Sequence, residues 1–461
     1  MRIDDLRIAY IGGGSRGWAY TFMTDIALES RMGGTIALYD LDLKSAQENA
    51  KIGNDLSLRP EAVGKWRYEV CSTLKETLSG ADFILISIMP GTMDEMTSDV
   101  HAPEKYGIYQ SVGDTTGPGG LIRALRTIPI YTGFAEAIAQ YAPKAWVINY
   151  TNPMALCVRA LYEAFPDVKA VGCCHEVFST QQLLSHALEE ILEVPRPRRE
   201  ELDVNVWGVN HFTWFDSAFW NGYDIMPVYR QFVDRYYETG FNEPNQNWMN
   251  SHFDCAHKVK FDLFRTYGFI AAAGDRHLAE FMPGDRYLAD PDVVKKYMFN
   301  LTPVSWRKQD LVGRRERSRR LVEHREKLEL VPSGEEGSRI IAALCGLERF
   351  VTNVNYPNFS GQIANLDHRS VVETNVVIGG DSVRPVYAGK IPGNLEDLFD
   401  RHITNQGLIM EAALSCTRDK ALAAFMSDPL ICGRLREDDG HQLFDQMLAS
   451  TAAYLPPGWG F

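Results

Sequence analysis

Short apolar runs alternate with amphipathic segments along the first half of the chain. These runs occupy residues 6–11, 35–39, 83–88, 145–149 and 168–172, and their lengths fit buried strands. Residues 154–165, between two of the runs, have apolar positions at helical spacing. Such an alternation of strands and helices predicts an α/β protein with a mostly parallel sheet of the Rossmann type.

The pattern changes at residues 194–199, which are rich in proline and arginine. Because proline-rich segments often connect domains, we predict a boundary at residue 198. Beyond it, runs at 204–209 and 370–377 predict strands, and residues 395–423 have the pattern of amphipathic helices. We therefore expect a Rossmann domain over residues 1–198. A mixed α+β domain for substrate binding and oligomerisation would follow over residues 199–461.

A glycine-rich turn directly follows the first predicted strand. Gly12, Gly14 and Gly17 have the GxGxxG spacing and precede a helical run. In nucleotide-binding folds the first glycine forms a tight turn, the second lets the backbone approach a pyrophosphate, and the third lets helix and strand pack. Together with Ser15 and Arg16, these glycines predict a dinucleotide site at the N-terminus of a helix.

Two acidic residues, Asp40 and Asp42, follow the second predicted strand. An acid at this point of a Rossmann domain binds ribose hydroxyls, which favours NAD over NADP. Asp40 is the predicted NAD ligand. Taken alone, the glycine pattern is also compatible with a flexible turn, an NAD dehydrogenase of the lactate or malate type, or an inactive nucleotide-binding protein.

Composition narrows the possible partners. The formal net charge of -13 opposes binding to nucleic acid. The basic stretch 314–325 contains interleaved glutamates and is typical of a solvated helix face. The eight cysteines are irregularly spaced, and we find neither a signal-peptide core nor an apolar run long enough to cross a bilayer. We expect reduced thiols, no membrane contact and a cytoplasmic location.

Two metal-binding residue types stand just beyond predicted strands. Cys174 follows the run 168–172, and His211 follows the run 204–209. The carboxyl ends of strands face the ligand crevice of an open α/β sheet, where a thiolate and an imidazole could share a divalent metal. Both could equally be ordinary buried residues.

Asn152 and Asp114 are further candidates for the same crevice. Asn152 precedes Pro153, so it could cap a helix whose first residue is that proline, or contact substrate hydroxyls. Asp114 stands in the glycine-rich stretch 113–120, which predicts either a plain turn or backbone that approaches a ligand. The stretch 274–280, with four ionisable residues, fits a catalytic loop or a surface loop.

Taken together, the motifs resemble the NAD- and metal-dependent glycoside hydrolases of family 4, which do not use the usual pair of carboxylates. The resemblance covers nearly the whole chain. It is carried by the glycine turn and by the stretches 114–129, 152–153, 174–177, 208–211 and 362–366, which read DTTGPGGLIRALRTIP, NP, CHEV, GVNH and QIANL.

This resemblance implies a divalent metal, usually Mn²⁺, on Cys174 and His211, and a sugar contact from Asn152. It also implies a redox-assisted elimination. NAD takes a hydride from carbon 3 of the sugar, the carbon 2 proton is removed, and the metal stabilises the enediolate while the glycosidic oxygen leaves. Water then adds at carbon 1 and the hydride is returned.

The sequence departs from the phosphosugar-specific members at the acid and the base. Their acid is an aspartate directly after the metal cysteine, where this chain has His175, and their base is a tyrosine in the loop that corresponds to 274–280. We predict His175 near the leaving group and Asp275 as the base, with His277 as its substitute. Asp114, in the matched stretch 114–129, completes the predicted catalytic set.

The CHEV tetrapeptide resembles that of the α-galacturonidase group within the family. This similarity implies an unphosphorylated α-galacturonide. The galacturonate carboxylate would need a cation, and Arg276, beside the predicted base, could supply a bidentate contact. We also count Glu176 among the predicted substrate contacts. Arg276 could instead pair with Asp275 or Glu280. An α-glucosidase or α-glucuronidase is the alternative within the family, and the resemblance further suggests a homodimer or homotetramer.

Overall fold

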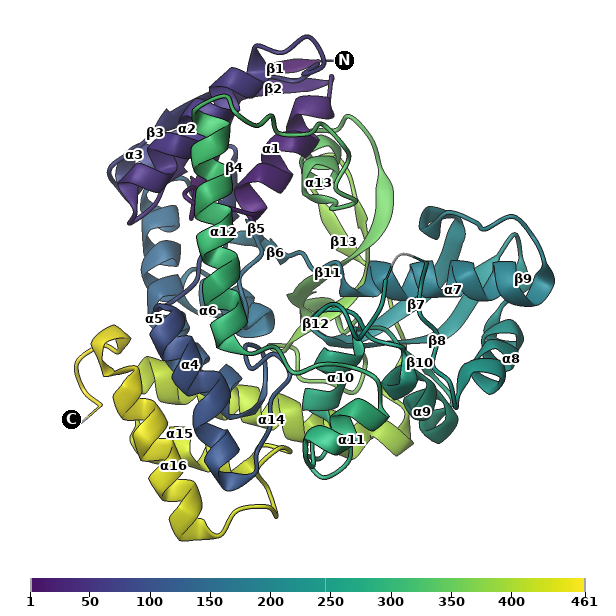
Figure 1. Ribbon diagram of the computed structural model, residues 1–461. Helices are drawn as coiled ribbons and strands as arrows, with labels where there is room; N and C mark the ends of the chain where they lie inside the picture. Colours follow the sequence, from purple (N-terminus) through teal and green to yellow (C-terminus); the bar gives the residue numbers. More distant parts are fainter. Residues whose placement is uncertain (1, 245, 460–461) are drawn as a thin grey trace.

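A nine-stranded sheet with helices on both faces forms the centre of the protein, and a smaller antiparallel sheet lies beside it (Figure 1). The computed structural model describes residues 2–244 and 246–459. The predicted class, an α/β protein with a Rossmann-type sheet and a second mixed region, is confirmed.

In spatial order, the large sheet consists of β13 (Val383–Pro385), β12 (Val371–Ile378), β11 (Phe350–Pro357), β6 (Lys169–Gly172), β5 (Trp146–Asn149), β4 (Phe83–Ile86), β1 (Ile3–Ile11), β2 (Met32–Tyr39) and β3 (Lys65–Val70). Strands β1 to β6 are parallel and have the 3-2-1-4-5-6 order of dinucleotide-binding sheets. All the predicted strands form. Strand β3 was not predicted, because its edge position leaves alternate residues polar.

The predicted boundary at residue 198 does not separate the two sheets. Strands β11, β12 and β13 lie far beyond it, yet β11 pairs antiparallel with β6 and extends the N-terminal sheet. The second half of the chain therefore contributes to the Rossmann sheet as well as to the smaller one.

Alternation along β1 determines which helices cover each face. Ile8 and Tyr10 pack with one group of helices, and Ala9 and Ile11 with the other. The first group is α1 (Trp18–Leu28), α2 (Leu43–Ser57) and α13 (Gly337–Leu344). The second is α3 (Leu74–Leu78), α5 (Gly117–Tyr141), α6 (Met154–Ala164), α14 (Gly393–Ser415), α15 (Arg418–Ser427) and α16 (Glu437–Ser450).

The smaller sheet consists of β7 (Leu202–Val209), β8 (Phe212–Trp220), β9 (Tyr223–Asp224) and β10 (Ile270–Ala271). Around it lie α7 (Glu176–Leu192), α8 (Met226–Tyr236), α9 (Lys258–Tyr267), α10 (Asp275–Phe281) and α11 (Pro291–Lys296). Its β7–β8 turn and α10 both reach toward the carboxyl edge of the large sheet, where the predicted site residues lie.

Two further helices connect the regions. Helix α12 (Val304–Val322) contacts both α2 and α4 (Met93–His101) and is the long central helix in Figure 1. It contains most of the basic stretch 314–325, whose arginines are largely exposed, as expected for a solvated face. Short 3₁₀ helices occupy Ala102–Tyr106, Arg199–Glu201, Asn358–Ser360 and Ala452–Tyr454. In the described residues, no helix combines the length and apolar character that a membrane span requires.

Candidate active site

The glycine turn connects β1 to α1 with a geometry that only glycine permits at its first position. Gly12 has φ +90°, and a Cβ atom there would lie 2.0 Å from the carbonyl oxygen of Ser87. The amide of Ser15 donates to the Gly12 carbonyl at 3.0 Å. Arg16 turns toward α2, where it pairs with Glu48 at 2.8 Å. The turn is therefore compact and leaves backbone, rather than side chains, at the sheet edge.

The two acidic candidates after β2 have different surroundings. Asp42 is the N-cap of α2, since its carboxylate accepts hydrogen bonds from the amide and hydroxyl of Ser45. Asp40 accepts a hydrogen bond from the amide of Gly14 at 2.9 Å, which joins the acid to the glycine turn. Of the two, Asp40 lies where a ribose contact was predicted.

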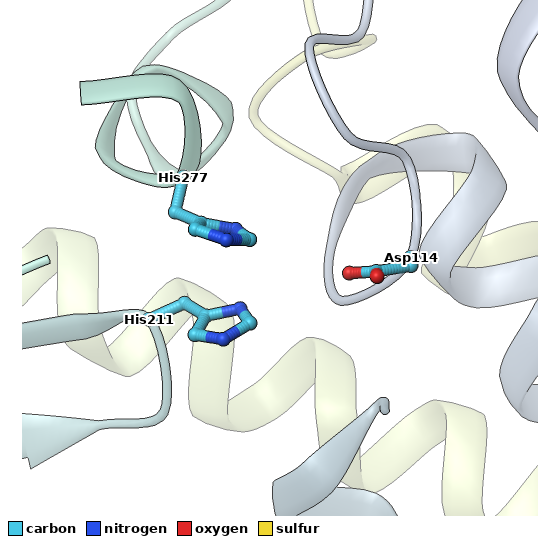
Figure 2. A group of neighbouring side chains, drawn as sticks. All are labelled: Asp114, His211 and His277. Atoms are coloured by element: carbon cyan, nitrogen blue, oxygen red, sulfur yellow. The ribbon is translucent and has the colours of Figure 1, made fainter. Parts of the chain in front are cut away.

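Three side chains from distant parts of the chain meet beyond the strand ends. Figure 2 shows the carboxylate of Asp114 facing the rings of His211 and His277. One ligand atom from each lies within 4.8 Å of the others. The two imidazole rings lie in contact, with centroids 3.7 Å apart and their planes tilted by 31°. Carboxylate oxygen and imidazole nitrogen are donors that suit a divalent cation such as Mn²⁺.

Hydrogen bonds fix the segments that carry these side chains. Glu280, on α10, accepts from the amides of Val112 and Gly113 at 2.7 and 2.9 Å, which holds the turn before Asp114 against α10. Thr115 contacts His211 Nδ1 at 2.9 Å. His211 itself has φ +65°, as the tight β7–β8 turn requires.

Burial and neighbouring charges set the protonation of this group. Burial alone would raise the pKa of Asp114, but Arg123 and the imidazoles of His277 and His211 lower it below the usual range. Burial lowers the pKa of both histidines. The nearby ring of His211 lowers the pKa of His277 further. A carboxylate beside two neutral imidazoles is the state in which all three can donate electron pairs.

The CHEV segment follows β6 and points its side chains in different directions. Glu176 accepts from the amide of Gly274 at 2.6 Å, and its other oxygen lies 3.6 Å from His277 Nε2. His175 lies half-exposed, with Nδ1 3.1 Å from a carboxylate oxygen of Glu335. This contact raises the pKa of His175 to about 9.

Cys174 is adjacent to this group but not a member of it. In the part of the chain that the structure describes, the metal-capable group around His211 contains Asp114 and His277, not Cys174. Burial raises the pKa of the Cys174 thiol, and the carboxylates of Glu373 and Glu176 raise it further. A metal shared by Cys174 and His211 stays a prediction.

Asn152 does not cap α6, contrary to one of its two predicted roles. The helix begins at Met154, Pro153 occupies the cap position, and no side chain caps it. Asn152 Oδ1 is instead buried without a hydrogen-bond partner, and its carbonyl accepts from Arg123 Nε at 3.0 Å. A buried, unpartnered amide oxygen fits the other predicted role, a contact to a bound ligand.

Asp275 is placed differently from the prediction that made it the base. It is fully buried and accepts from the amides of Val259 and Lys260 at 3.0 and 3.2 Å, so it caps the start of α9. It also lies in a second group with Cys255 and His257. The structure therefore brings His277, and not Asp275, to Asp114 and His211, because one turn of α10 directs neighbouring residues to opposite sides.

Arg276 is buried between α10 and the segment before α12. Its Nη2 donates to Thr302 Oγ1 at 2.5 Å and lies 3.3 Å from the carbonyl of Ser111, whereas its Nε has no partner. No ion pair joins it to Asp275 or Glu280 among the described residues. Burial lowers its pKa to about 10.

Some residues of the site were not foreseen. Glu335, beside His175, and Glu373, which accepts from Asn353 at 2.7 Å next to Cys174, come from segments without a local motif. Burial raises the pKa of Glu373 to about 7. Arg307 on α12 also lowers the pKa of Asp114. In the sequence these residues are single charged positions outside any motif, so no pattern predicted them.

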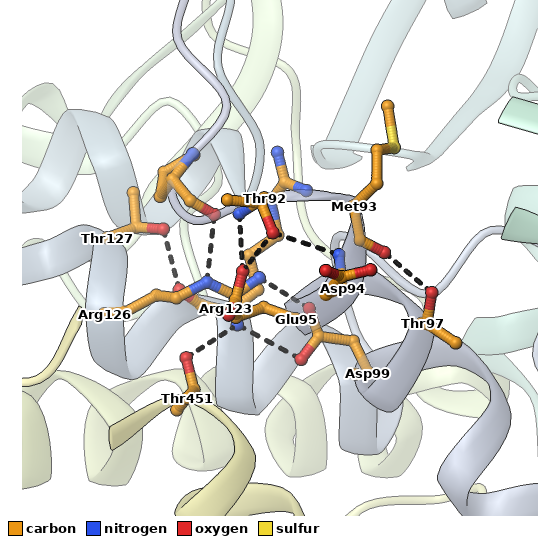
Figure 3. Close-up of polar contacts among 12 residues, drawn as sticks. Thr92, Met93, Asp94, Glu95, Thr97, Asp99, Arg123, Arg126, Thr127 and Thr451 are labelled. Atoms are coloured by element: carbon orange, nitrogen blue, oxygen red, sulfur yellow. Dashed lines mark hydrogen bonds and ion pairs between the residues drawn. The ribbon is translucent and has the colours of Figure 1, made fainter. Parts of the chain in front are cut away.

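A buried ion pair anchors helix α5, which carries Arg123 (Figure 3). Arg126 donates to both carboxylate oxygens of Asp99 on α4, at 2.5 and 3.1 Å, and to the carbonyl of Pro90. The side chains of Arg126 and Asp99 are 0% and 2% exposed. Helix α5 is thereby fixed against α4 below the site.

Replacing Asp99 by alanine is expected to lower the free energy of unfolding by about 3–5 kcal/mol, because it leaves the Arg126 charge buried without its partner. Thermal and urea unfolding, followed by circular dichroism, measure the change. Glu163→Ala, which removes the surface partner of Arg159, is the control and should cost at most about 0.5 kcal/mol. Equal effects of the two substitutions would contradict the assigned role of the buried pair.

Comparison with known proteins identifies the family of the chain. The model of the family 4 glycosyl hydrolases matches residues 7–190, and that of the family 4 glycosyl hydrolase C-terminal domain matches residues 206–431. The chain therefore belongs to family 4 of the glycosyl hydrolases, as its motifs implied.

Individual relatives extend the comparison to the full length. The chain is 57% identical over 459 residues to an alpha-galacturonidase of Thermoanaerobacterium saccharolyticum, covering 99% of this chain and 98% of the relative. The crystal structure of lplD from Bacillus subtilis superposes with a TM-score of 0.92 at 50% identity, covering 96% of this chain and 100% of that one. A 6-phospho-alpha-glucosidase from gut microorganisms, in complex with NAD and Mn²⁺, shares the fold with a TM-score of 0.78 at 21% identity, over 98% and 99% of the two chains.

Proposed function

We propose that this family 4 enzyme is an α-galacturonidase that depends on NAD and a divalent metal, preferably Mn²⁺. The observation that carries the proposal is the 57% identity, over nearly the whole of both chains, to a protein named alpha-galacturonidase. The CHEV tetrapeptide and the buried, unpaired Arg276 support an acidic rather than a neutral sugar. Family membership argues against a lactate-type dehydrogenase and an inactive nucleotide-binding protein.

The residues present fit both cofactors. The turn from Gly12 to Gly17 offers backbone amides at the start of α1, and Asp40 would bind ribose hydroxyls. His211 would hold the metal with Cys174, as the family implies, or with Asp114 and His277, which lie nearer to it. When bound, NAD supplies a reversible hydride acceptor for carbon 3 of the sugar, and the metal stabilises negative charge on the neighbouring oxygens.

The chain's own residues would handle the protons. His277 is buried against Asp114 and Glu176, and its Nδ1 has no partner, so it is placed to accept the carbon 2 proton. His175, held by Glu335 at the exposed side, would donate a proton to the leaving oxygen. Asn152 and Glu176 would orient sugar hydroxyls. Burial of this group excludes bulk water while the glycosidic bond breaks.

Turnover of four α-glycosides with a common leaving group tests the proposal: galacturonide, glucuronide, glucoside and galactoside, each with NAD, Mn²⁺ and a reducing agent. We expect the highest kcat/KM for the galacturonide. A higher value for the glucuronide or the glucoside would transfer the assignment to the alternatives within the family. A cytoplasmic location and an assembly of two or four subunits stay predictions, which cell fractionation and light scattering would check.

A further inference from the structure

Three arginines surround Asp114 without a carboxylate partner of their own. Arg123 comes from α5, Arg276 from α10 and Arg307 from α12, and no ion pair within 4.0 Å involves any of them in the described residues. The other buried cations in the described residues are paired, Arg126 with Asp99 and Lys260 with Asp275. Guanidiniums that lie in a largely buried place without an ion pair of their own are costly unless a further anion joins them.

The segment that carries Arg307 packs directly on Arg276. Thr302, two residues before α12, accepts a hydrogen bond from Arg276 Nη2 at 2.5 Å. Trp306 packs edge to face against Phe253, with ring centroids 5.0 Å apart, and the Phe253 ring lies 5.0 Å from the Arg276 guanidinium. Arg307 therefore comes from a segment that contacts Arg276 directly, and Phe253 lies against both Trp306 and Arg276.

The guanidiniums of Arg276 and Arg307 each have a buried nitrogen without a hydrogen-bond partner. Arg276 Nε and Arg307 Nε are both shielded from solvent, and neither has a hydrogen-bond partner. Arg123 differs, because its Nε is used by the carbonyl of Asn152. The free, buried donors thus belong to Arg276 and Arg307, and Arg123 serves to position the Asn152 turn.

We infer that Arg307 and Arg276 form a two-sided subsite for the carboxylate of the uronic acid substrate, in which Arg307 is a specificity-determining residue. This inference rests on the proposed function. Planar guanidiniums match carboxylate geometry with paired N–H donors, so a carboxylate between the two would satisfy both free Nε–H groups. It would also relieve the repulsion by which Arg307 lowers the pKa of Arg276, after the effect of burial. A hydroxymethyl group at carbon 5 could do neither.

The test compares Arg307→Met and Arg307→Lys with Arg319→Met, which removes an exposed arginine from the same helix. Kinetics are measured with the α-galacturonide and the α-galactoside. Calorimetry measures binding of free galacturonate and galactose. Arg307→Met should lower kcat/KM for the galacturonide and the affinity for galacturonate roughly 10- to 100-fold, because charged hydrogen bonds are lost. The values for the galactoside and galactose should stay within about threefold, and lysine should restore part of the loss.

Two outcomes would overturn the inference. Either Arg307→Met weakens both sugars equally, which indicates a general structural role, or it weakens neither. Failure of the proposed function has a different signature, namely wild-type protein that does not cleave the galacturonide. Even then, the difference between wild type and Arg307→Met in galacturonate binding decides whether the subsite exists.

Discussion

Removing the bound divalent metal and NAD from the purified protein is expected to abolish α-galacturonide hydrolysis. An ordinary glycosidase uses a pair of carboxylates, one as acid and one as base or nucleophile. In this site Asp114 and Glu176 both lie against imidazoles instead. Without the hydride acceptor and the cation, the carbon 2 proton is not acidic enough for an imidazole to remove. The measurement is release of the leaving group after chelation and gel filtration.

Adding back Mn²⁺ and NAD together should restore the rate, whereas either one alone should not. Absorbance at 340 nm should show no accumulation of NADH during turnover, because the hydride is returned to the sugar. In heavy water the product should carry deuterium at carbon 2. Full activity after both cofactors are removed would refute the proposed mechanism, and steady formation of NADH would instead indicate a dehydrogenase.

Replacing His277 by asparagine is expected to lower kcat for the galacturonide by about 10²- to 10⁴-fold, the usual contribution of a general base. His277 is the ionisable residue of α10 that contacts His211 and approaches Glu176. Asparagine retains polarity but cannot accept the proton. The measurements are kcat with saturating Mn²⁺ and NAD, and the rate of deuterium incorporation at carbon 2.

His441→Asn, on the exposed surface of α16, is the matched control and should leave kcat unchanged. The affinity for Mn²⁺, measured by calorimetry, separates two roles of His277. A base variant keeps the affinity and loses the exchange, whereas loss of Mn²⁺ binding would make His277 a metal ligand. If the variant keeps both kcat and deuterium incorporation at carbon 2, another residue is the base.

Hydrogen bonds between segments hold the parts of the site in place. Glu280 joins the turn of Asp114 to α10, Asp275 joins α10 to α9, and Gly274 is held by Glu176. Catalytic groups have to keep their separation within fractions of an ångström, so such bonds matter as much as the groups themselves. The same stretch 274–280 therefore supplies both the proposed base, His277, and residues that hold it in place.

Local features of the sequence were sufficient to predict the parallel strands of the large sheet, the glycine turn and the family. A buried parallel strand is a short continuous apolar run, so β1, β2, β4, β5 and β6 could be recognised one at a time. The glycine turn was recognisable from its GxGxxG spacing. The structure explains the first glycine, because Gly12 has a positive φ and a Cβ atom there would clash with Ser87. Family membership followed from short motifs, each complete within a few residues.

What only the tertiary structure decided concerns direction and distance. The sequence favoured Asp275 as the base, with His277 as its substitute, but the start of α10 turns the first toward α9 and the second toward His211. It offered two roles for Asn152, and the start of α6 at Met154 excludes the helix cap. Arg307 had no motif at all. Such outcomes depend on contacts between separate segments, as between His211 and His277, whereas consecutive residues mark β1 and the glycine turn that follows it.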